Sequence, residues 1–278
     1  MIKPELHRRY WLIELISYWE GRLTTGHLRQ FFGISRQQAS KDINQYQQEH
    51  TGNLEYCPSR KGYLPGKYFN PAHISADVAE YLNWVTGQSA HTMPADPGYR
   101  LEHTILLPPA RKVSAQVIRQ LVHALRHHER LDVDYGAVSS SDRDGRIIVP
   151  VRFVNTGSRW HLRAWCEKAQ NYRDFVLSRF HGTPTPEGKP LAPLPPDTRW
   201  NTHITLHITP DPRLSPEQQQ ALIHDYAMNN GRLEINTRAA LAGYLLREMQ
   251  INTKMLDINP AAQQLILANQ DEVKEWLF

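Results

Sequence analysis

Residues 24–50 read TTGHLRQFFGISRQQASKDINQYQQEH, and this stretch decides the fold of the N-terminal part of the chain. The threonine pair at 24–25 can cap a short apolar helix. Gly33 stands where a helix commonly ends in a left-handed conformation. Ser35, with Gln38 three residues later, matches the capping box that begins a further helix. The stretch therefore predicts a short helix, a tight turn and a longer helix.

The flanking sequence extends this pattern to a winged helix-turn-helix. Residues 5–20 carry apolar side chains at helical spacing, which predicts an amphipathic helix before the turn. Two short β-like pieces follow at 54–57 and 62–64, joined by a basic tip. A hairpin directly after a recognition helix is typical of a wing. The sequence therefore predicts a winged helix-turn-helix domain over residues 1–72.

The charge of the chain is concentrated in this domain. The chain has 278 residues, of which 32 are Lys or Arg and 28 are Asp or Glu, giving a formal net charge of +4. Residues 1–70 contain ten of the basic and six of the acidic residues, so the whole excess lies there. Basic charge gathered in one segment indicates a module that binds a polyanion.

The longer helix has one apolar face and one polar face. Ala39, Ile43 and Tyr46 should pack on the preceding helices, while the polar face carries hydrogen-bonding side chains and no acidic one. Such a face fits the major groove of DNA, although it is also compatible with an ordinary solvated surface. The residues expected to contact DNA, in this helix and in the hairpin, are Ser35, Arg36, Gln37, Ser40, Lys41, Asn44, Arg60, Lys61 and Tyr63.

The middle of the chain changes from helices to short strands. Helices are expected at 75–86 and 115–128, and strands at 131–135, 146–151, 159–167 and 172–177. Several short strands in close succession indicate a small barrel or a strongly curved sheet. Residues 182–200 are rich in proline and glycine and are expected to be a linker.

The C-terminal segment alternates between strand and helix patterns, which predicts a small α+β domain. The expected strands are 203–209, 232–236 and 254–258, and the expected helices are 215–225, 237–247 and 260–277.

The segment Trp160-His161-Leu162-Arg163-Ala164-Trp165-Cys166, followed by residues 172–180, resembles the WYL domain. Trp160-His161-Leu162 stands at the Trp-Tyr-Leu triplet of that family, with histidine in place of tyrosine. Arg173, Phe175 and Arg179 match its arginine-rich final strand. With the winged helix before it and the α+β segment after it, the whole chain resembles WYL-type bacterial transcriptional regulators and is similar to the phage-defence repressors BrxR and CapW.

The resemblance implies an α+β, multidomain chain whose centre is an Sm/SH3-like β-barrel. The domains expected are a winged helix-turn-helix (1–72), a helical linker or dimerisation segment (73–128), the ligand-sensing WYL barrel (129–181), a linker (182–200) and a small α+β domain (201–278).

The resemblance also implies that the barrel binds a nucleotide or a nucleic acid, because arginines grip phosphates and rings stack on bases. The residues expected in this site are Tyr135, Ser139, His161, Arg163, Arg173 and Arg179. A histidine in place of the tyrosine adds a group that titrates near neutrality. In the alternative interpretation, Trp160, Trp165 and Phe175 are core residues and the arginines pair with nearby aspartates.

Together these features predict a sequence-specific transcriptional regulator, a homodimeric repressor that a nucleotide-like ligand releases from a palindromic operator. No Walker A, G-x-S-x-G, H-E-x-x-H or dinucleotide-binding motif occurs, so we expect neither enzymatic activity nor a cofactor. Two alternatives stay open. One is a nucleic-acid-processing enzyme or accessory subunit that uses the WYL-like module as a clamp, and the other is a scaffold that binds DNA without sequence preference.

The sequence predicts neither a membrane-spanning or secreted protein nor a metal site. The apolar runs are far shorter than the roughly 20 residues of a membrane span, and the start of the chain carries no secretory signal. Cys57 and Cys166 lie far apart and outside any C-x-x-C pattern, which favours the reducing cytoplasm. His123 and His127 lie one helical turn apart but have no cysteine or carboxylate set beside them, so we expect no metal site.

Overall fold

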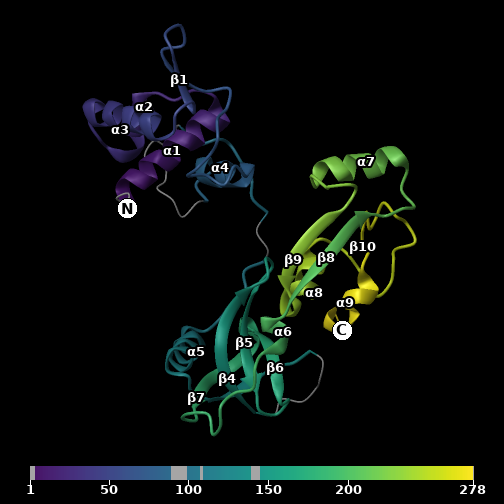
Figure 1. The fold of residues 1–278 in the computed structure, drawn as a ribbon. Helices are drawn as coiled ribbons and strands as arrows, with labels where there is room; N and C mark the ends of the chain where they lie inside the picture. The colour runs from purple at the N-terminus through teal and green to yellow at the C-terminus, as the bar shows by residue number, and fades with distance from the viewer. Residues whose placement is uncertain (1–3, 89–98, 107–108, 139–144, 278) are drawn as a thin grey trace. The chain divides into compact units, whose positions relative to one another are not determined.

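The computed structural model describes residues 4–88, 99–106, 109–138 and 145–277 (Figure 1). The chain divides into two compact units, Met1–Leu106 and Leu107–Phe278. The first unit has one hydrophobic core and the second has two. No helix within the described ranges combines the length and the apolar character needed to cross a bilayer.

The first unit is the predicted winged helix-turn-helix. Its core forms where the first three helices meet, and Ile13, Leu28 and Ile43 are completely buried there. The elements are α1 (Pro4–Glu20), α2 (Thr25–Phe32), α3 (Arg36–Glu49), the hairpin strands β1 (Leu54–Cys57) and β2 (Gly62–Pro65), and α4 (Val78–Val85).

Local signals set the turn between α2 and α3. Gly33 ends α2 with a φ of 64°, the left-handed conformation that glycine adopts without strain. Ser35 caps α3 by accepting a hydrogen bond from the backbone N–H of Gln38 at 3.1 Å. The Gln38 side chain donates to Asp42 at 2.7 Å, and Asp42 forms an ion pair of 2.7 Å with Arg9 of α1. The capping sequence therefore also ties α3 to α1.

The wing has a third strand-like segment that the sequence does not signal. β1 and β2 pair in antiparallel register, with Tyr56 opposite Tyr63. Leu23 then exchanges two backbone hydrogen bonds of 2.8 Å with Tyr63. Arg22 donates from Nε to the Arg60 carbonyl at the tip, at 2.8 Å. The segment between α1 and α2 therefore holds the hairpin in place.

The second unit begins with α5 (Ala115–His127), which packs on an antiparallel five-stranded sheet. The strand order is β6-β5-β4-β3-β7. Bulges interrupt the pairing of β3 with β7 and of β4 with β5, and bulges bend a sheet. The strands are β3 (Leu131–Tyr135), β4 (Arg146–Asn155), β5 (Trp160–Cys166), β6 (Asn171–Val176) and β7 (Phe180–Pro186).

The sheet is open in the part of the chain that the structure describes. β6 and β7 lie at its two edges and are not paired with each other. The four strands expected from the sequence are present, but the expected closed Sm/SH3-like barrel is not found. The bulges bend the sheet without joining its edges.

The expected linker, residues 182–200, is ordered at both ends. Its first five residues complete β7, which pairs with β3, and its last residues enter the short helix α6 (Thr198–Asn201). Proline is tolerated in β7 because β7 is an edge strand, where one side needs no ladder hydrogen bond. Asp197 caps α6 by accepting from the Trp200 N–H at 3.2 Å. The prediction of a linker is therefore wrong for residues 182–186 and 197–200.

The last part of the chain is a three-stranded sheet, ordered β10-β8-β9, with helices beside it. Two predictions for this part are wrong. Residues 254–258 form no strand, and the last helix starts ten residues later than expected. The elements are β8 (His203–Pro210), α7 (Pro216–Asp225), β9 (Leu233–Arg238), α8 (Ala239–Glu248), β10 (Leu265–Leu267) and α9 (Gln270–Leu277).

Tertiary pairing explains both differences. Leu265 and Leu267 are buried and pair with β8, whereas every residue from 254 to 258 is exposed. Asn269 accepts from the His207 N–H of β8 at 2.9 Å and donates to the Thr205 carbonyl at 2.9 Å. These two bonds hold the chain against the sheet until α9 begins at the next residue.

Candidate DNA-binding and ligand-binding sites

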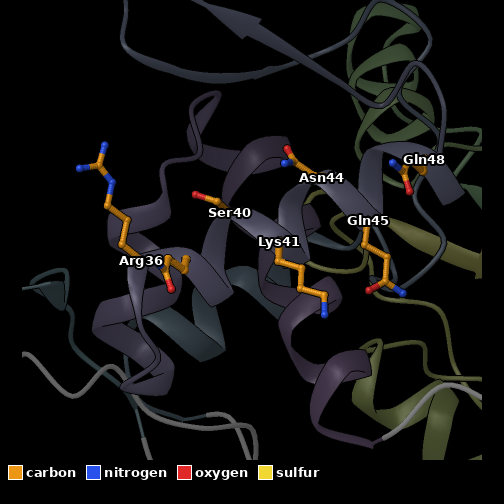
Figure 2. A pocket seen from close by; sticks show the side chains of 7 residues that line it. Arg36, Ser40, Lys41, Asn44, Gln45 and Gln48 are labelled. Atoms are coloured by element: carbon orange, nitrogen blue, oxygen red, sulfur yellow. The ribbon is translucent and has the colours of Figure 1, made fainter.

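The polar face of α3 is exposed, and its apolar face is buried as the sequence predicts. Ala39, Ile43 and Tyr46 are completely buried. The side chains on the other side project from successive turns of the helix (Figure 2) and line one open surface. They belong to Arg36, Gln37, Ser40, Lys41, Asn44, Gln45 and Gln48, of which only Ser40 and Gln45 are half-buried.

The charge on this surface is positive. Arg36 and Lys41 are the charged residues among those that line it. Asp42 is buried on the other side of α3 and paired with Arg9, and Glu49, exposed at the end of the helix, accepts a hydrogen bond from Gln45 at 2.9 Å. Ser35 lies at the N-terminus of α3, where free backbone N–H groups and the helix dipole favour a phosphate. The face therefore offers amide groups suited to base edges and cations suited to phosphates.

The three hairpin residues that were predicted to contact DNA differ in their exposure to solvent. Arg60 and Lys61 are exposed at the tip, where Lys61 has a φ of 48°. Tyr63 is half-buried against the core, and burial raises the pKa of its hydroxyl. Tyr56, whose ring centroid lies 5.3 Å from that of Tyr63, is 58% exposed and was not predicted. The hairpin register, which puts these two tyrosines opposite each other, is the signal that could have found it.

Arg163, predicted in the ligand site, is buried and held by two carboxylates. Its Nε and Nη2 atoms contact the two oxygens of Asp197 at 2.5 and 2.7 Å, and Nη1 contacts Asp174 at 2.9 Å. Burial opposes the charge of the guanidinium, but the hydrogen bonds with Asp197 and Asp174 outweigh it, and its pKa is raised. Arg163 thus joins β5 to β6 and to the cap of α6.

Two other predicted residues, Tyr135 and Arg173, are placed differently, and a third lies outside the described residues. Tyr135 is buried, and its hydroxyl accepts from the Val176 N–H at 2.9 Å. Arg173 is exposed and lies opposite Ala164 in the register of β5 and β6, which puts it on the other face of the sheet from His161. Ser139 lies outside the described residues.

His161 and Arg179 lie instead in a cluster of arginines. Arg159 is half-buried, and burial, followed by the positive charges of Arg179, Arg111 and Arg247, lowers its pKa. Of these, Arg247 comes from α8, so the C-terminal part contributes to the cluster. Arg111, Arg159 and Arg247 were not predicted. Arg111 and Arg247 lie far from the WYL motif in the sequence, so the motif gives no signal for them.

A pocket of about 310 Å³ lies at this cluster. Trp160, which the sequence favours as a core residue, is instead 53% exposed at the rim of the pocket, so that prediction is wrong, whereas Phe175 is buried. The lining residues that can hold an anion and an aromatic ring are Arg111, Asn155, Ser158, Arg159, Trp160 and Ser178.

His161 is buried beside this cluster and is 1% exposed. Its ring lies 5.0 Å from that of Tyr244 of α8, and its Nδ1 atom has no hydrogen-bond partner among the described residues. Burial, with the positive charge of Arg159 next, lowers the pKa of His161 to about 4. The ring is therefore neutral near pH 7, and the hydrogen-bonding capacity of its Nδ1 atom is not used by the described residues.

Tyr244 connects His161 to the buried ion pairs. Its hydroxyl donates to Asp174 at 3.2 Å, and burial raises the pKa of that hydroxyl to about 12. Asp174 in turn holds Arg163. A continuous set of contacts therefore runs from the arginine cluster through α8 to α6.

Three family models match the sequence, and together they span most of it. They are the BrxR transcriptional regulator winged helix-turn-helix domain at residues 5–87, the WYL domain at 116–183, and the BrxR transcriptional regulator C-terminal dimerization domain at 203–273.

Curated relatives match nearly the whole chain. A DNA-binding transcriptional repressor CapW from Stenotrophomonas maltophilia is 31% identical over 275 residues, which cover 98% of this chain and 92% of that protein. CapW from Escherichia coli (strain KTE188) is 33% identical over 267 residues, which cover 94% and 89% of the two chains. The structure of proteasome accessory factor B/C (PafBC) of Arthrobacter aurescens is 17% identical, covering 98% of this chain and 47% of that one, with a TM-score of 0.27, too low to establish a common fold.

The buried neutral His161 predicts a specific loss of stability in acid. The unfolded chain protonates this ring near its ordinary pKa of 6.5, but the folded chain does so only near 4. The stability that the neutral ring contributes is therefore present above pH 6.5 and is lost as the pH falls towards 4. Between pH 7 and pH 5, urea unfolding should show the wild type losing about 2 kcal/mol more than His161→Phe. His123→Phe, at an exposed position, should behave as the wild type does; equal losses in all three proteins would contradict the assignment.

Proposed function

The chain belongs to the family of the CapW and BrxR transcriptional repressors, and from this premise we propose that it is a homodimeric repressor that binds a DNA operator through α3. The observation that carries the proposal is the open surface of α3, whose seven lining residues have amide, hydroxyl and cationic side chains, none of them acidic. By resemblance, the genes under its control belong to a phage-defence locus.

The chemistry of each side chain suggests its role on the DNA. Gln37 and Asn44 can each form two hydrogen bonds with adenine, and Arg36 or Lys41 can bind guanine or a phosphate. Ser40 lies between them and can bond with either. The first turn of α3, with Ser35, would bind a phosphate at the edge of the groove.

The hairpin would bind beside the groove that α3 enters. Arg60 and Lys61 at its tip supply positive charge close to the phosphates. Tyr63, which is half-buried, would support the hairpin, and the more exposed Tyr56 is the tyrosine available to the DNA.

Selection of duplexes from a random-sequence pool tests the proposal, and we expect a palindromic site. On that site, Gln37→Ala should weaken binding by about tenfold or more and relax the preference at one position in each half-site. Lys41→Ala should weaken binding and reduce its dependence on salt. The control is Arg119→Ala, which removes the same charge from an exposed position of α5.

Both variants change exposed residues, so their melting temperatures should match that of the wild type. Wild-type affinity of both variants in a gel-shift assay would show that α3 is not the reading element. Enrichment of no sequence at all would favour the scaffold that binds DNA without preference.

A homodimer requires an interface, and the C-terminal part contains an exposed apolar segment suited to one. Ile258 is 97% exposed, Met255 73% and Leu256 52%. Large apolar side chains gathered at one surface indicate a contact with another protein. This segment lies inside the match to the C-terminal dimerization domain, so we assign it to the contact with a second copy of the chain.

Changing this segment should therefore separate the two copies. Ile258→Asp together with Met255→Asp buries charge in the contact, and light scattering after size-exclusion chromatography should show a monomer. Leu191→Asp is the matched control, because Leu191 is 89% exposed but lies outside the dimerization match. A stable dimer in the double variant, or a monomer in the control, would place the contact elsewhere.

The effector would bind the arginine cluster beside Trp160. Arg111 and Arg159 suit a phosphate, and Trp160 offers a face for a base. Because the charge of Arg247 on α8 acts on Arg159, an anion bound beside Arg159 would also be attracted by the dimerization part. Such a ligand can favour a dimer geometry that does not fit the operator.

A short single-stranded oligodeoxynucleotide is a suitable probe of this site. Its binding, followed by fluorescence anisotropy, should weaken by about tenfold in Arg159→Ala, because a charge-assisted contact to phosphate is lost. Arg173→Ala should bind like the wild type, since Arg173 lies on the other face of the sheet. If Arg173→Ala weakens binding and Arg159→Ala does not, the site is the set of residues expected from the WYL resemblance.

A further inference from the structure

Glu14, on the buried side of α1, is a charged group without a cationic partner among the described residues. It is 0% exposed. Its carboxylate accepts from the Tyr46 hydroxyl at 2.8 Å and from the backbone N–H groups of Ala72, His73 and Ile74 at 2.7–3.2 Å. All four donors are neutral. A buried negative charge without a counter-charge is costly, so a cation held next to it would be stabilised.

Two imidazoles lie beside this carboxylate. His50 is the residue that ends α3, and His73 follows the wing. Their Nε2 atoms are 3.1 Å apart. One carboxylate oxygen of Glu14 and one nitrogen of each ring all lie within 4.8 Å of one another. Two nitrogen lone pairs repel each other at 3.1 Å, so either a proton or a metal ion lies between them.

The surroundings of His73 favour a metal-binding tautomer. Its Nδ1 atom is 3.2 Å from Nδ1 of the exposed His7. When the Nδ1–H of His73 donates to His7, its Nε2 carries the lone pair that faces His50. Metal-binding histidines are typically oriented by such a bond from the other ring nitrogen.

We propose that Glu14, His50 and His73 form a binding site for a divalent transition-metal ion, with Zn²⁺ as the preferred ion. Two imidazoles and one carboxylate are an established donor set for zinc, with the fourth position open to water. Oε1 of Glu14 is the better metal ligand of the two carboxylate oxygens, because it accepts two hydrogen bonds whereas Oε2 accepts three. The Tyr46 hydroxyl would then compete with the metal for Oε1.

The site would join the segments that position α3. Glu14 belongs to α1, His50 ends α3, and His73 follows the hairpin. Asn44 and Gln48, on the exposed face, lie within two turns of His50. A bound ion would therefore stabilise the first unit, and it would do so whether or not α3 reads DNA.

Titration of the full chain with Co²⁺ and Zn²⁺, after treatment with a chelator, tests the proposal. We expect one ion per chain at this site and the visible absorption of Co²⁺ bound to nitrogen and oxygen. His50→Gln and His73→Gln should each weaken binding by more than about tenfold and abolish that absorption. Zn²⁺ should raise the melting temperature of the wild type but not of either variant. Circular dichroism confirms that the variants are folded.

The matched control is the double variant His123→Gln, His127→Gln. These two rings lie on α5 with centroids 4.4 Å apart, and the His123 side chain is 56% exposed. The control should retain the high-affinity ion and the absorption. Binding that follows the control pair, or that persists in both site variants, would overturn the proposal. Absence of binding and of any zinc-dependent melting shift would show that His50 and His73 share a proton instead.

Discussion

The rotation of α3 about its own axis is the constraint on which the DNA-binding face depends. A helix turned by a third of a revolution would bury its amides and expose its apolar residues. Ile43 and Ala39 prevent this by packing in the core, and two polar contacts add direction. Asp42 pairs with Arg9, and Tyr46 donates to Glu14, so both contacts join α3 to α1. Directional contacts of this kind fix an orientation that apolar packing alone leaves adjustable.

A second buried contact organises the other unit. Arg163 binds Asp197 and Asp174 at once, so the WYL sheet, the segment before α6 and, through Tyr244, helix α8 share one network. A fully satisfied network of this kind is rigid, and removing one member leaves a buried charge unpaired. Arg247 lies on the same helix as Tyr244, beside the arginine cluster. The candidate ligand pocket is therefore connected through side-chain contacts to the C-terminal part of the chain.

Local signals in the sequence predicted most of the elements, and the errors fall where tertiary pairing decides. Gly33 and Ser35 determine the conformation of the residues next to them in the chain. The turn before α3 could therefore be located from the local sequence alone. Residues 254–258 and 265–267 are both short and apolar, and only the availability of β8 as a partner makes the second a strand. The prolines and glycines of residues 182–200 led to the prediction of a linker, but an edge strand such as β7 accommodates proline.

The two candidate sites differ in the same respect. The face of α3 is contiguous on one helix, so periodicity assigned its residues without a structure. The arginine cluster is assembled from positions 111, 159, 179 and 247. The group of Glu14, His50 and His73, of which only Glu14 is buried, spans three separate segments of the chain, so neither set has a sequence spacing to detect. His161 shows the converse. The motif marks it, but only its burial, together with the positive charges of Arg159, Arg179 and Arg247, explains why the ring of this histidine stays neutral.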